Sequence, residues 1–353
     1  MQTDQVIAER YRLLAELGRG GMGIVWRAED VVLGRQVAVK EVLSPSDDAA
    51  RRALREARSA ARLSHPSVVK VYDVVEEGGR PWVVMEYVEA RSLQEVIKQD
   101  GPLPPDRAAR IGCQLLSALG AAHRVGILHR DVKPGNVLLA KGDRAVLTDF
   151  GIATIEGDVT LTQAGGVLGS PAYIAPERFL GERALPASDL WALGATLYAA
   201  TSGRPPFHRD DPVAVFGAVL NDEPPIPPQA QALRPVLEGL LRKDPRERMP
   251  IGVAEAVLLA ISEDLAINED RLPRLPPVVH PQATGGGTTL TTAAATATNG
   301  AGAAANGRSA ATTALPVVPE RDRDLSWRVG GIFACVGMAL LLLGSLFVLL
   351  SSR

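Results

Sequence analysis

The sequence has few cysteines and no excess of basic residues. Cys113 and Cys335 are the two cysteines in 353 residues, one in a predicted helix and one in an apolar C-terminal run. These two cysteines support neither a disulfide framework nor a zinc site, and their small number fits a reducing compartment. A formal net charge of −2 argues against nucleic-acid partners, which usually require a basic excess. The first 17 residues contain no apolar run, so we expect no secretory signal.

Composition divides the chain into zones. Residues 1–10 are predicted to be a lead-in, and residues 11–262 carry the patterning of one folded domain. Residues 263–328 are rich in Pro, Ala, Thr and Gly and too poor in large apolar residues to offset conformational entropy, which predicts a disordered linker. Residues 329–350 are an uncharged run of 22 residues, followed by a tail of residues 351–353.

The apolar run is predicted to be a transmembrane helix. At 1.5 Å per residue it spans roughly 33 Å, enough for a hydrocarbon core of about 30 Å. Arg321, Arg323 and Arg328 precede it with Trp327, whereas Arg353 is the one charge beyond it. The positive-inside rule then places the preceding domain in the cytoplasm, and we expect a single-pass protein of the cell membrane.

The folded zone begins with strand-like segments and continues with helices. Alternating apolar runs separated by Gly34 and by Gly78-Gly79 predict hairpins between residues 11 and 90. One helix interrupts them at residues 47–63, with Leu54, Ala57 and Ala61 on its packed face. From residue 92 onward helical patterns dominate. One of them follows Pro104-Pro105 and has an apolar stripe of Ile111, Leu115, Leu119 and Ala122. The pattern predicts an α+β fold with a β-rich lobe followed by a helical lobe.

Two motifs in the first lobe suit a nucleotide. Gly18, Gly20 and Gly23 are spaced as G-x-G-x-x-G, but the β-branched residues that follow predict a strand, which disfavours a Rossmann turn. An ordinary glycine-rich turn is the alternative. In "VAVK" the alternation puts Ala38 and Lys40 on one face. Glu56, in the one early helix, could hold Lys40, although most lone Lys/Glu pairs are solvated salt bridges.

Two further motifs suit phosphate chemistry in the second lobe. In "HRDVKPGN", Asp131 can accept a hydroxyl proton, Lys133 can steady a phosphoryl group, and Asn136 offers a neutral oxygen to Mg²⁺. "DFG" follows 13 residues after Asn136 and supplies Asp149 as a second oxygen ligand. The sequence between them is typical of a hairpin that brings Asn136 and Asp149 together.

Together these motifs resemble those of the bacterial, eukaryotic-like Ser/Thr protein kinases. The resemblance covers residues 11–262 and includes "GSPAYIAPE", "SDLW" and "KDPRERM" in the order of that family. It implies the bilobal protein kinase fold, with an N-lobe at about residues 11–88 and a C-lobe at about 89–262. It also implies ATP and Mg²⁺ as cofactors, with Mn²⁺ able to replace Mg²⁺, and protein Ser/Thr side chains as substrates. An actinobacterial source fits the composition, and homodimers through the small lobe are common in such kinases.

The resemblance implies a role for each matching position. Asp131 is the catalytic base, Lys133 and the Lys40–Glu56 ion pair complete the catalytic set, and Asn136 and Asp149 bind the metal. ATP is expected to contact a set of N-lobe, hinge and hairpin residues: Leu17, Gly18, Gly20, Gly23, Val25, Ala38, Lys40, Met85, Glu86, Val88 and Leu138. Three positions are implied to be structural, namely a buried Glu177–Arg248 ion pair and Asp189, which braces the catalytic loop.

Activation is expected to depend on the segment after Asp149. Arg130, next to the catalytic base, invites a phosphate there. Thr162 matches one family autophosphorylation position, whereas Ala164 occupies the other, so Thr160 is a second candidate.

Three rival functions are weighed against this interpretation. A pseudokinase is disfavoured because Lys40, Asp131, Asn136 and Asp149 are all present. A small-molecule phosphotransferase of the kinase-like superfamily is disfavoured by the "APE" segment and by Lys133. A receptor that senses ligands outside the cell is disfavoured by the three-residue tail, and the chain is expected to lack an extracellular sensor domain. Physiological substrates are not readable from the sequence.

Overall fold

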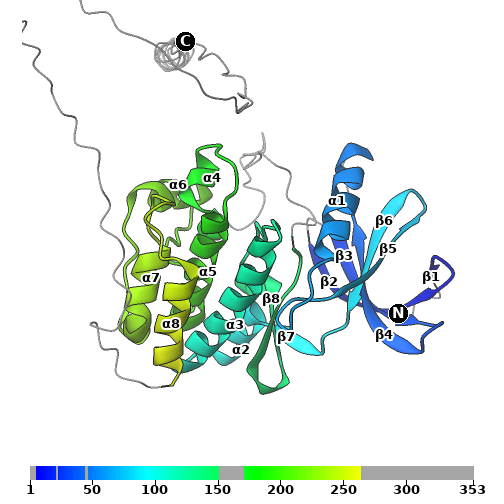
Figure 1. Cartoon of the computed structure of the whole chain (residues 1–353), viewed down its shortest axis with the longest axis horizontal. Helices are drawn as coiled ribbons and strands as arrows, with labels where there is room; N and C mark the ends of the chain where they lie inside the picture. The colour runs from blue at the N-terminus through cyan, green and yellow to red at the C-terminus, as the bar shows by residue number, and fades with distance from the viewer. Residues whose placement is uncertain (1–4, 21–22, 44–46, 151–170, 264–353) are drawn as a thin grey trace, which may run out of the picture. The chain divides into compact units, whose positions relative to one another are not determined.

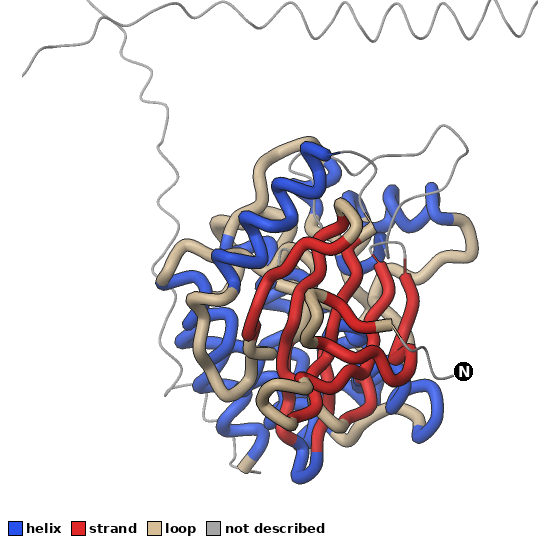
Figure 2. The backbone as a smooth tube through the Cα atoms, turned by 90° about the vertical axis from the view of Figure 1, so that its right-hand side faces the viewer, coloured by secondary structure: helices blue, strands red, loops and turns tan. Residues whose placement is uncertain are grey.

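The first lobe contains a six-stranded antiparallel sheet (Figures 1 and 2). The computed structural model describes residues 5–20, 23–43, 47–150 and 171–263. The strands run in the spatial order β1-β2-β3-β4-β6-β5. Their bounds are β1 Val6–Ile7, β2 Tyr11–Gly20, β3 Gly23–Asp30, β4 Arg35–Val42, β5 Val71–Glu77 and β6 Arg80–Glu86. The predicted lead-in of residues 1–10 therefore contains a strand, and the sheet begins before the predicted domain start at residue 11.

The two faces of β4 alternate as the sequence predicted. Val37 and Val39 are fully buried in one apolar cluster, with Trp82 and Val84 of β6. Ala38 belongs to a second cluster on the opposite face of the sheet. Because side chains alternate along a strand, Lys40 lies on the same face as Ala38. Gly34 and Gly78-Gly79 have positive φ in the predicted hairpin turns.

Helix α1 (Asp47–Ala60) packs on the Ala38 face through alanines. The buried residues are Ala53, Ala57 and Ala60, whereas Leu54 is half-buried and Ala61 is exposed. Of the predicted packing residues, Ala57 is therefore correct. Leu54 and Ala61 are wrong by one position each, because Ala53 and Ala60 are buried in their place. Small side chains allow the helix to lie close to the strands, and Ala61 lies beyond the last helical residue.

The second lobe is helical, apart from a small three-stranded sheet. Its helices are α2 Leu93–Asp100, α3 Pro105–Arg124, α4 Pro176–Phe179, α5 Pro186–Ser202, α6 Pro212–Asn221, α7 Arg234–Leu240 and α8 Ile251–Ser262. Its strands are β7 Ala90–Ser92, β8 Val137–Ala140 and β9 Arg144–Leu147. The 3-10 turns are η1 Pro134–Asn136, η2 Lys141–Asp143, η3 Pro171–Tyr173 and η4 Pro228–Leu233.

Helices α3 and α5 form the centre of this lobe (Figure 1). The predicted stripe of α3, Ile111, Leu115, Leu119 and Ala122, is buried with at most 1% exposure, so that prediction is confirmed. Every residue of α5 from Ser188 to Thr201 is buried, which is typical of a helix surrounded by other elements. Polar groups on α5 must therefore find partners inside the protein.

A buried ion pair joins α4 to the segment before α8. Arg248 donates from Nη1 and Nη2 to the two carboxylate oxygens of Glu177 at 2.7 and 2.6 Å. Ser188 donates a further hydrogen bond to Glu177 at 2.6 Å, and both ionic side chains are at most 3% exposed. Burial alone would raise the pKa of Glu177, but the hydrogen bonds from Arg248 and Ser188 lower it below its usual value. The predicted Glu177–Arg248 pair is thus present.

Residues 264–353 lie outside the described part of the chain, and with them nearly all of the predicted linker and the whole apolar run 329–350. Within residues 5–20, 23–43, 47–150 and 171–263, no helix has the length and apolar character needed to cross a membrane.

Replacing Arg248 by methionine should destabilise the protein by about 3–5 kcal/mol, because Glu177 would keep a buried, uncompensated charge. Urea unfolding of the full chain measures this loss. The matched control is Arg246→Met, since the Arg246–Asp244 pair leaves Arg246 86% exposed and should contribute less than about 1 kcal/mol. Equal losses in the two variants would contradict a stabilising role for the buried pair.

Candidate active site

The backbone of the loop at residues 129–136 is fixed by a buried carboxylate. Asp189, near the start of α5, is 2% exposed and accepts hydrogen bonds from the amides of His129 at 2.9 Å and Arg130 at 2.8 Å. His123 of α3 contacts the same carboxylate through Nε2 at 2.8 Å. The predicted contact between Asp189 and the loop backbone is therefore present. It also holds Arg130 at φ +67°, a conformation that is costly for a residue with a side chain.

His129 links this loop to the end of β9. Its Nδ1 accepts from the amide of Asp131 at 3.3 Å, and its Nε2 lies 2.9 Å from the carbonyl oxygen of Thr148. These two contacts assign the proton to Nε2, because Nδ1 acts as the acceptor. Complete burial lowers the pKa of His129, and the neutral ring therefore suits both contacts.

Three polar side chains converge within the loop. Lys133 donates from Nζ to Oδ2 of Asp131 at 2.8 Å. The side-chain nitrogen of Asn136, Nδ2, donates to the same oxygen at 2.8 Å. Asn136 also donates to the backbone oxygen of Asp131 at 2.8 Å. Asp131 remains 26% exposed, so a hydroxyl group can reach its carboxylate.

The β8–β9 hairpin brings Asn136 beside Asp149, as predicted. Val137 pairs with Leu147 at the open end of the hairpin, and the amide of Thr148 donates to the backbone oxygen of Asn136 at 3.0 Å. Asp149 follows at φ +63°, a second left-handed residue with a side chain. Non-glycine residues in this conformation cluster at functional sites, where the surrounding contacts hold them.

Lys40 pairs with Asp149 in this structure. Its Nζ lies 2.5 Å from Oδ1 of Asp149, and the lysine side chain is 4% exposed. Burial of Asp149 would raise its pKa, but the charge and hydrogen bond of Lys40 lower it below the usual value. The carboxylate is therefore ionised and can serve a cation.

The predicted Lys40–Glu56 ion pair is not the one formed here. Glu56 instead accepts a hydrogen bond from Nη1 of Arg130 at 2.8 Å, and this contact joins α1 to the loop of the second lobe. The physical reason is position, because Glu56 on α1 lies at hydrogen-bond distance from Arg130, whereas Nζ of Lys40 lies at that distance from Asp149. Lys40 and Glu56 therefore each have a partner other than the predicted one, namely Asp149 and Arg130.

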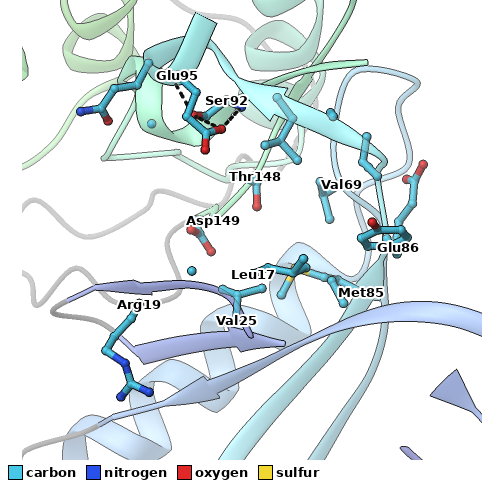
Figure 3. A pocket seen from close by; sticks show the side chains of 18 of the residues that line it. Leu17, Arg19, Val25, Val69, Met85, Glu86, Ser92, Glu95, Thr148 and Asp149 are labelled. Atoms are coloured by element: carbon cyan, nitrogen blue, oxygen red, sulfur yellow. Dashed lines mark hydrogen bonds between the residues drawn. The ribbon is translucent and has the colours of Figure 1, made fainter. Parts of the chain in front are cut away.

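A pocket of about 620 Å³ lies between the sheet and the β8–β9 hairpin (Figure 3). Leu17 and Val25 line it from one side, and Thr148 and Asp149 line it from the other. Eight of the predicted ATP-binding residues line it: Leu17, Gly18, Val25, Ala38, Met85, Glu86, Val88 and Leu138. Gly20, Gly23 and Lys40 are not among its lining residues. Val25, Ala38, Met85 and Leu138 form an apolar part of the lining, and charged residues such as Arg19, Glu95 and Lys98 line the pocket as well.

The three loop glycines have different structural needs. Gly23 has φ +143°, and a side chain there would collide with the backbone oxygen of Glu41 on β4. Side chains at Gly18 and Gly20 would meet no other described atom within 4 Å. Gly23 is thus required by the hairpin itself, whereas Gly18 and Gly20 leave open space beside the pocket for a close backbone approach to a ligand.

Glu86 uses its side chain and its backbone differently. Its carboxylate accepts from Nη2 of Arg144 at 3.0 Å, outside the pocket interior. Its amide donates to the backbone oxygen of Lys70 at 2.8 Å. The contact between the backbone oxygen of Glu86 and adenine stays a prediction.

Several lining residues were missed by the sequence analysis. Val69 and Thr148 line the pocket because the amide of Val69 donates to the backbone oxygen of Leu147 at 2.9 Å. Gln94, Glu95 and Lys98 come from α2. Thr148 directly precedes the "DFG" motif, and this position in the sequence could have identified it as a pocket residue. No feature of the sequence indicated that α2 lines the pocket.

Asn136 and Asp149 fit a divalent cation. The amide nitrogen of Asn136 is committed to Asp131, which leaves its Oδ1 to face a metal. The described residues contain no cluster of three or more His, Cys, Asp or Glu side chains that could cage an ion. Two oxygen ligands suit Mg²⁺, which keeps waters and binds phosphate oxygens as well. The predicted phosphorylation sites Thr160 and Thr162 lie outside the described residues.

This arrangement is that of a bilobal phosphotransferase, and the sequence comparisons identify the family. The profile of the protein kinase domain matches residues 11–258, so the chain belongs to the protein kinase family. Members of this family use ATP and divalent metal ions.

The relatives are bacterial. The chain is 39% identical over 292 residues to serine/threonine-protein kinase PknE of Mycobacterium bovis, which covers 78% of this chain and 51% of that protein. It is 39% identical over 250 residues to serine/threonine-protein kinase PrkC of Bacillus subtilis, a match that covers 69% of this chain and 39% of PrkC. It is 43% identical over 248 residues to PknD of Mycobacterium tuberculosis, covering 67% and 37%. The chain thus spans about half or less of the length of these relatives, each of which is named a serine/threonine-protein kinase.

Burial of His129 predicts a pH dependence of stability. Its folded-state pKa lies below the ordinary value of 6.5, so the unfolded chain binds the proton first as the pH falls. The stabilisation is therefore complete above about pH 6.5 and is lost below it, by about 1 kcal/mol at one pH unit lower. Urea unfolding across this range should show the loss in wild type and a flatter profile in His129→Gln. The control is His208→Gln, at an exposed histidine. Identical profiles for wild type and His129→Gln would contradict this assignment.

Proposed function

We propose that this chain transfers the γ-phosphate of ATP to Ser and Thr hydroxyls of proteins. The observation that carries the proposal is the set of contacts around Asp131. Lys133 and Asn136 both bond to its carboxylate at 2.8 Å, and the Thr148–Asn136 hydrogen bond places Asp149 beside them at the edge of the 620 Å³ pocket. An acceptor for a hydroxyl proton thus lies next to groups suited to hold phosphates.

ATP binds with its adenine in the apolar part of the pocket. Val25 and Ala38 from the sheet and Leu138 from β8 line this part and would enclose the ring. The backbone groups of Glu86 and Val88 would supply hydrogen bonds to it, and Met85 would close the pocket behind. The phosphates then lie under Gly18 and Gly20, where the absence of side chains leaves room.

The reaction needs little covalent chemistry from the protein. Asp131 accepts the proton of the substrate hydroxyl, and Lys133 steadies the transferred phosphoryl group. Lys40 binds the α- and β-phosphates after exchanging Asp149 for Glu56. Asn136 and Asp149 would hold Mg²⁺, or Mn²⁺ in its place, and the metal neutralises phosphate charge when bound.

Autophosphorylation activates the enzyme, with Thr162 as the main site and Thr160 as the second candidate. The support is Arg130, which already holds an anion, Glu56, at 2.8 Å. A phosphate forms stronger charge-assisted hydrogen bonds with arginine than a carboxylate does. Its binding to Arg130 would release Glu56 toward Lys40, and the predicted Lys40–Glu56 pair belongs to that active state.

The kinase domain is cytoplasmic and tethered to the cell membrane by residues 329–350 for signalling. The support is the length of that uncharged run and the arginines before it. A homodimer through the first lobe would bring two domains together for autophosphorylation. The exposed side chains of Val32 and Leu33, at 70% and 58%, give that lobe an apolar contact.

Incubation of the full chain with ATP and Mg²⁺ should incorporate phosphate, and phosphopeptide mapping should find it on Thr162. Asp131→Asn should reduce the rate by about 10²–10⁴-fold, because the proton acceptor is lost. Asp143→Asn is the matched control: it is the same change in an ion pair with Arg107 outside the site, and it should keep the wild-type rate. Equal incorporation in wild type and Asp131→Asn would refute the mechanism.

Deleting residues 329–353 should move the protein from the membrane fraction to the soluble fraction, because the apolar run supplies the anchor. Cell fractionation followed by a high-salt wash measures this distribution. A deletion of 25 residues within the linker, residues 285–309, serves as the control and should leave the protein in the membrane fraction. Membrane retention of the chain that lacks residues 329–353 would contradict the proposed anchor.

A further inference from the structure

A second cavity lies next to the nucleotide pocket. It has a volume of about 350 Å³, and its lining includes Gln94, Lys98, Lys133, Gly135, Tyr173 and Arg204. Three of these, Gln94, Lys98 and Gly135, also line the nucleotide pocket. The cavity reaches the reaction centre through Lys133, whose Nζ bonds to Asp131 at 2.8 Å. A chain whose hydroxyl sits at Asp131 can therefore extend into it.

The charge of this cavity has one sign. Lys98, Lys133 and Arg204 line it, and no acidic side chain does so among the described residues. Lys133 is paired with Asp131, but Lys98 and Arg204 are exposed and form no ion pair within the described part of the chain. Two cations from separate elements thus face one cavity without an internal counter-charge.

The acids nearest in the sequence to Lys98 are engaged elsewhere. The carboxylate of Glu95 accepts from the amide and hydroxyl of Ser92 at 2.7 and 2.8 Å, which caps α2. Asp100 accepts from Nη2 of Arg91 at 2.6 Å. Neither acid forms an ion pair with Lys98 in the described part of the chain, where Asp100 is paired with Arg91.

The backbone at Arg204 is held by its neighbours, and its side chain is exposed. Gly203 ends α5 at φ +82°, and Ser202 donates to the backbone oxygen of Arg204 at 2.6 Å. Tyr173 lines the same cavity, and burial raises its pKa to about 12, so its hydroxyl is a neutral donor. The cavity therefore offers two cations and a hydroxyl donor to an incoming group. Cations at the ends of α2 and α5 also offset the helix dipoles, but that role does not require them to share a cavity.

We propose that this cavity is the subsite for an anionic side chain of the protein substrate, a carboxylate or a phosphate, two to four residues from the acceptor Ser or Thr. The proposal rests on the kinase activity proposed above and names its substrate class. An extended peptide advances about 3.3 Å per residue, so a side chain at this separation extends from Asp131 past Lys133 toward Lys98 and Arg204. Charge-assisted hydrogen bonds to these cations would select it.

The test measures kcat/KM of the full chain for a set of Thr peptides in a neutral background. Aspartate, phosphoserine, alanine or lysine is placed in turn at each position from four before to four after the threonine. We expect aspartate or phosphoserine to exceed alanine by about fivefold or more at one position two to four residues away, with lysine below alanine. Preference for aspartate identifies a carboxylate as the ligand, and preference for phosphoserine alone identifies a previously phosphorylated substrate.

Reversing the charge of a cavity residue then tests whether the preference for an acidic peptide arises in this cavity. In Arg204→Glu and in Lys98→Glu, the ratio of kcat/KM for the acidic peptide over the alanine peptide should fall by about fivefold, and lysine should become the better residue. Lys141→Glu is the matched control, because Lys141 is an exposed cation that lines neither cavity, and it should keep the wild-type ratio.

The outcomes separate this inference from the proposed function. Absence of phosphate transfer to any peptide and to the chain itself would refute the kinase activity. Transfer with equal rates for acidic and alanine peptides, or with a preference for lysine, would refute the anionic subsite alone. An acidic preference that survives both charge reversals would also refute the assignment to this cavity.

Discussion

The carboxylate of Asp189 is the contact on which the proposed active site depends. This side chain lies inside a helical core, and its oxygens are satisfied there by two backbone amides and by His123. The same hydrogen bonds fix the backbone of His129 and Arg130. They hold Arg130 in the left-handed conformation, which a loop without such support would avoid. His129 extends this order to the amide of Asp131 and to Thr148, next to Asp149. One buried charge therefore positions both ends of the proposed phosphate site.

The contacts between the lobes are of a different kind. Lys40–Asp149 and Glu56–Arg130 join groups on the sheet and on α1 to groups in the second lobe, and both acids are more than 20% exposed. Both partners of Glu56–Arg130 retain contact with water, so this pair contributes little net stability and can be exchanged at low cost. Lys40 is 4% exposed, so its ammonium group needs an anionic partner, which is Asp149 in this structure. The second lobe thus presents a fixed catalytic loop, whereas the charges facing it from the first lobe can be rearranged.

The sequence predicted the parts of this protein that local patterns determine. The alternation in β4 placed Ala38 and Lys40 on one face, and the spacing in α3 identified its buried stripe. The fixed strings around Asp131 and Asp149 named residues that the β8–β9 hairpin does bring together. The ion-pair partner of Lys40 could not be predicted, because two acids, Glu56 and Asp149, are candidates. Which of them bonds to Lys40 depends on distances in the tertiary structure. The face of α1 was misassigned because a helix rich in alanine has a weak apolar contrast. The second cavity has no sequence signature, since α2, the residues after α5 and the catalytic loop meet only in the fold.

Gln94, Lys98 and Gly135 form a wall common to the two cavities. A side chain at position 135 would meet Oε1 of Gln94 at 2.9 Å, so it would require the exposed end of Gln94 to move. Ligands on its two sides consequently depend on the same rotamers of Gln94 and Lys98. Any coupling that results is a property of the pair of sites, and by thermodynamic reciprocity each ligand changes the affinity of the other by the same factor. A compound that binds one cavity would therefore change the affinity of the other only to the extent that it moves these shared side chains.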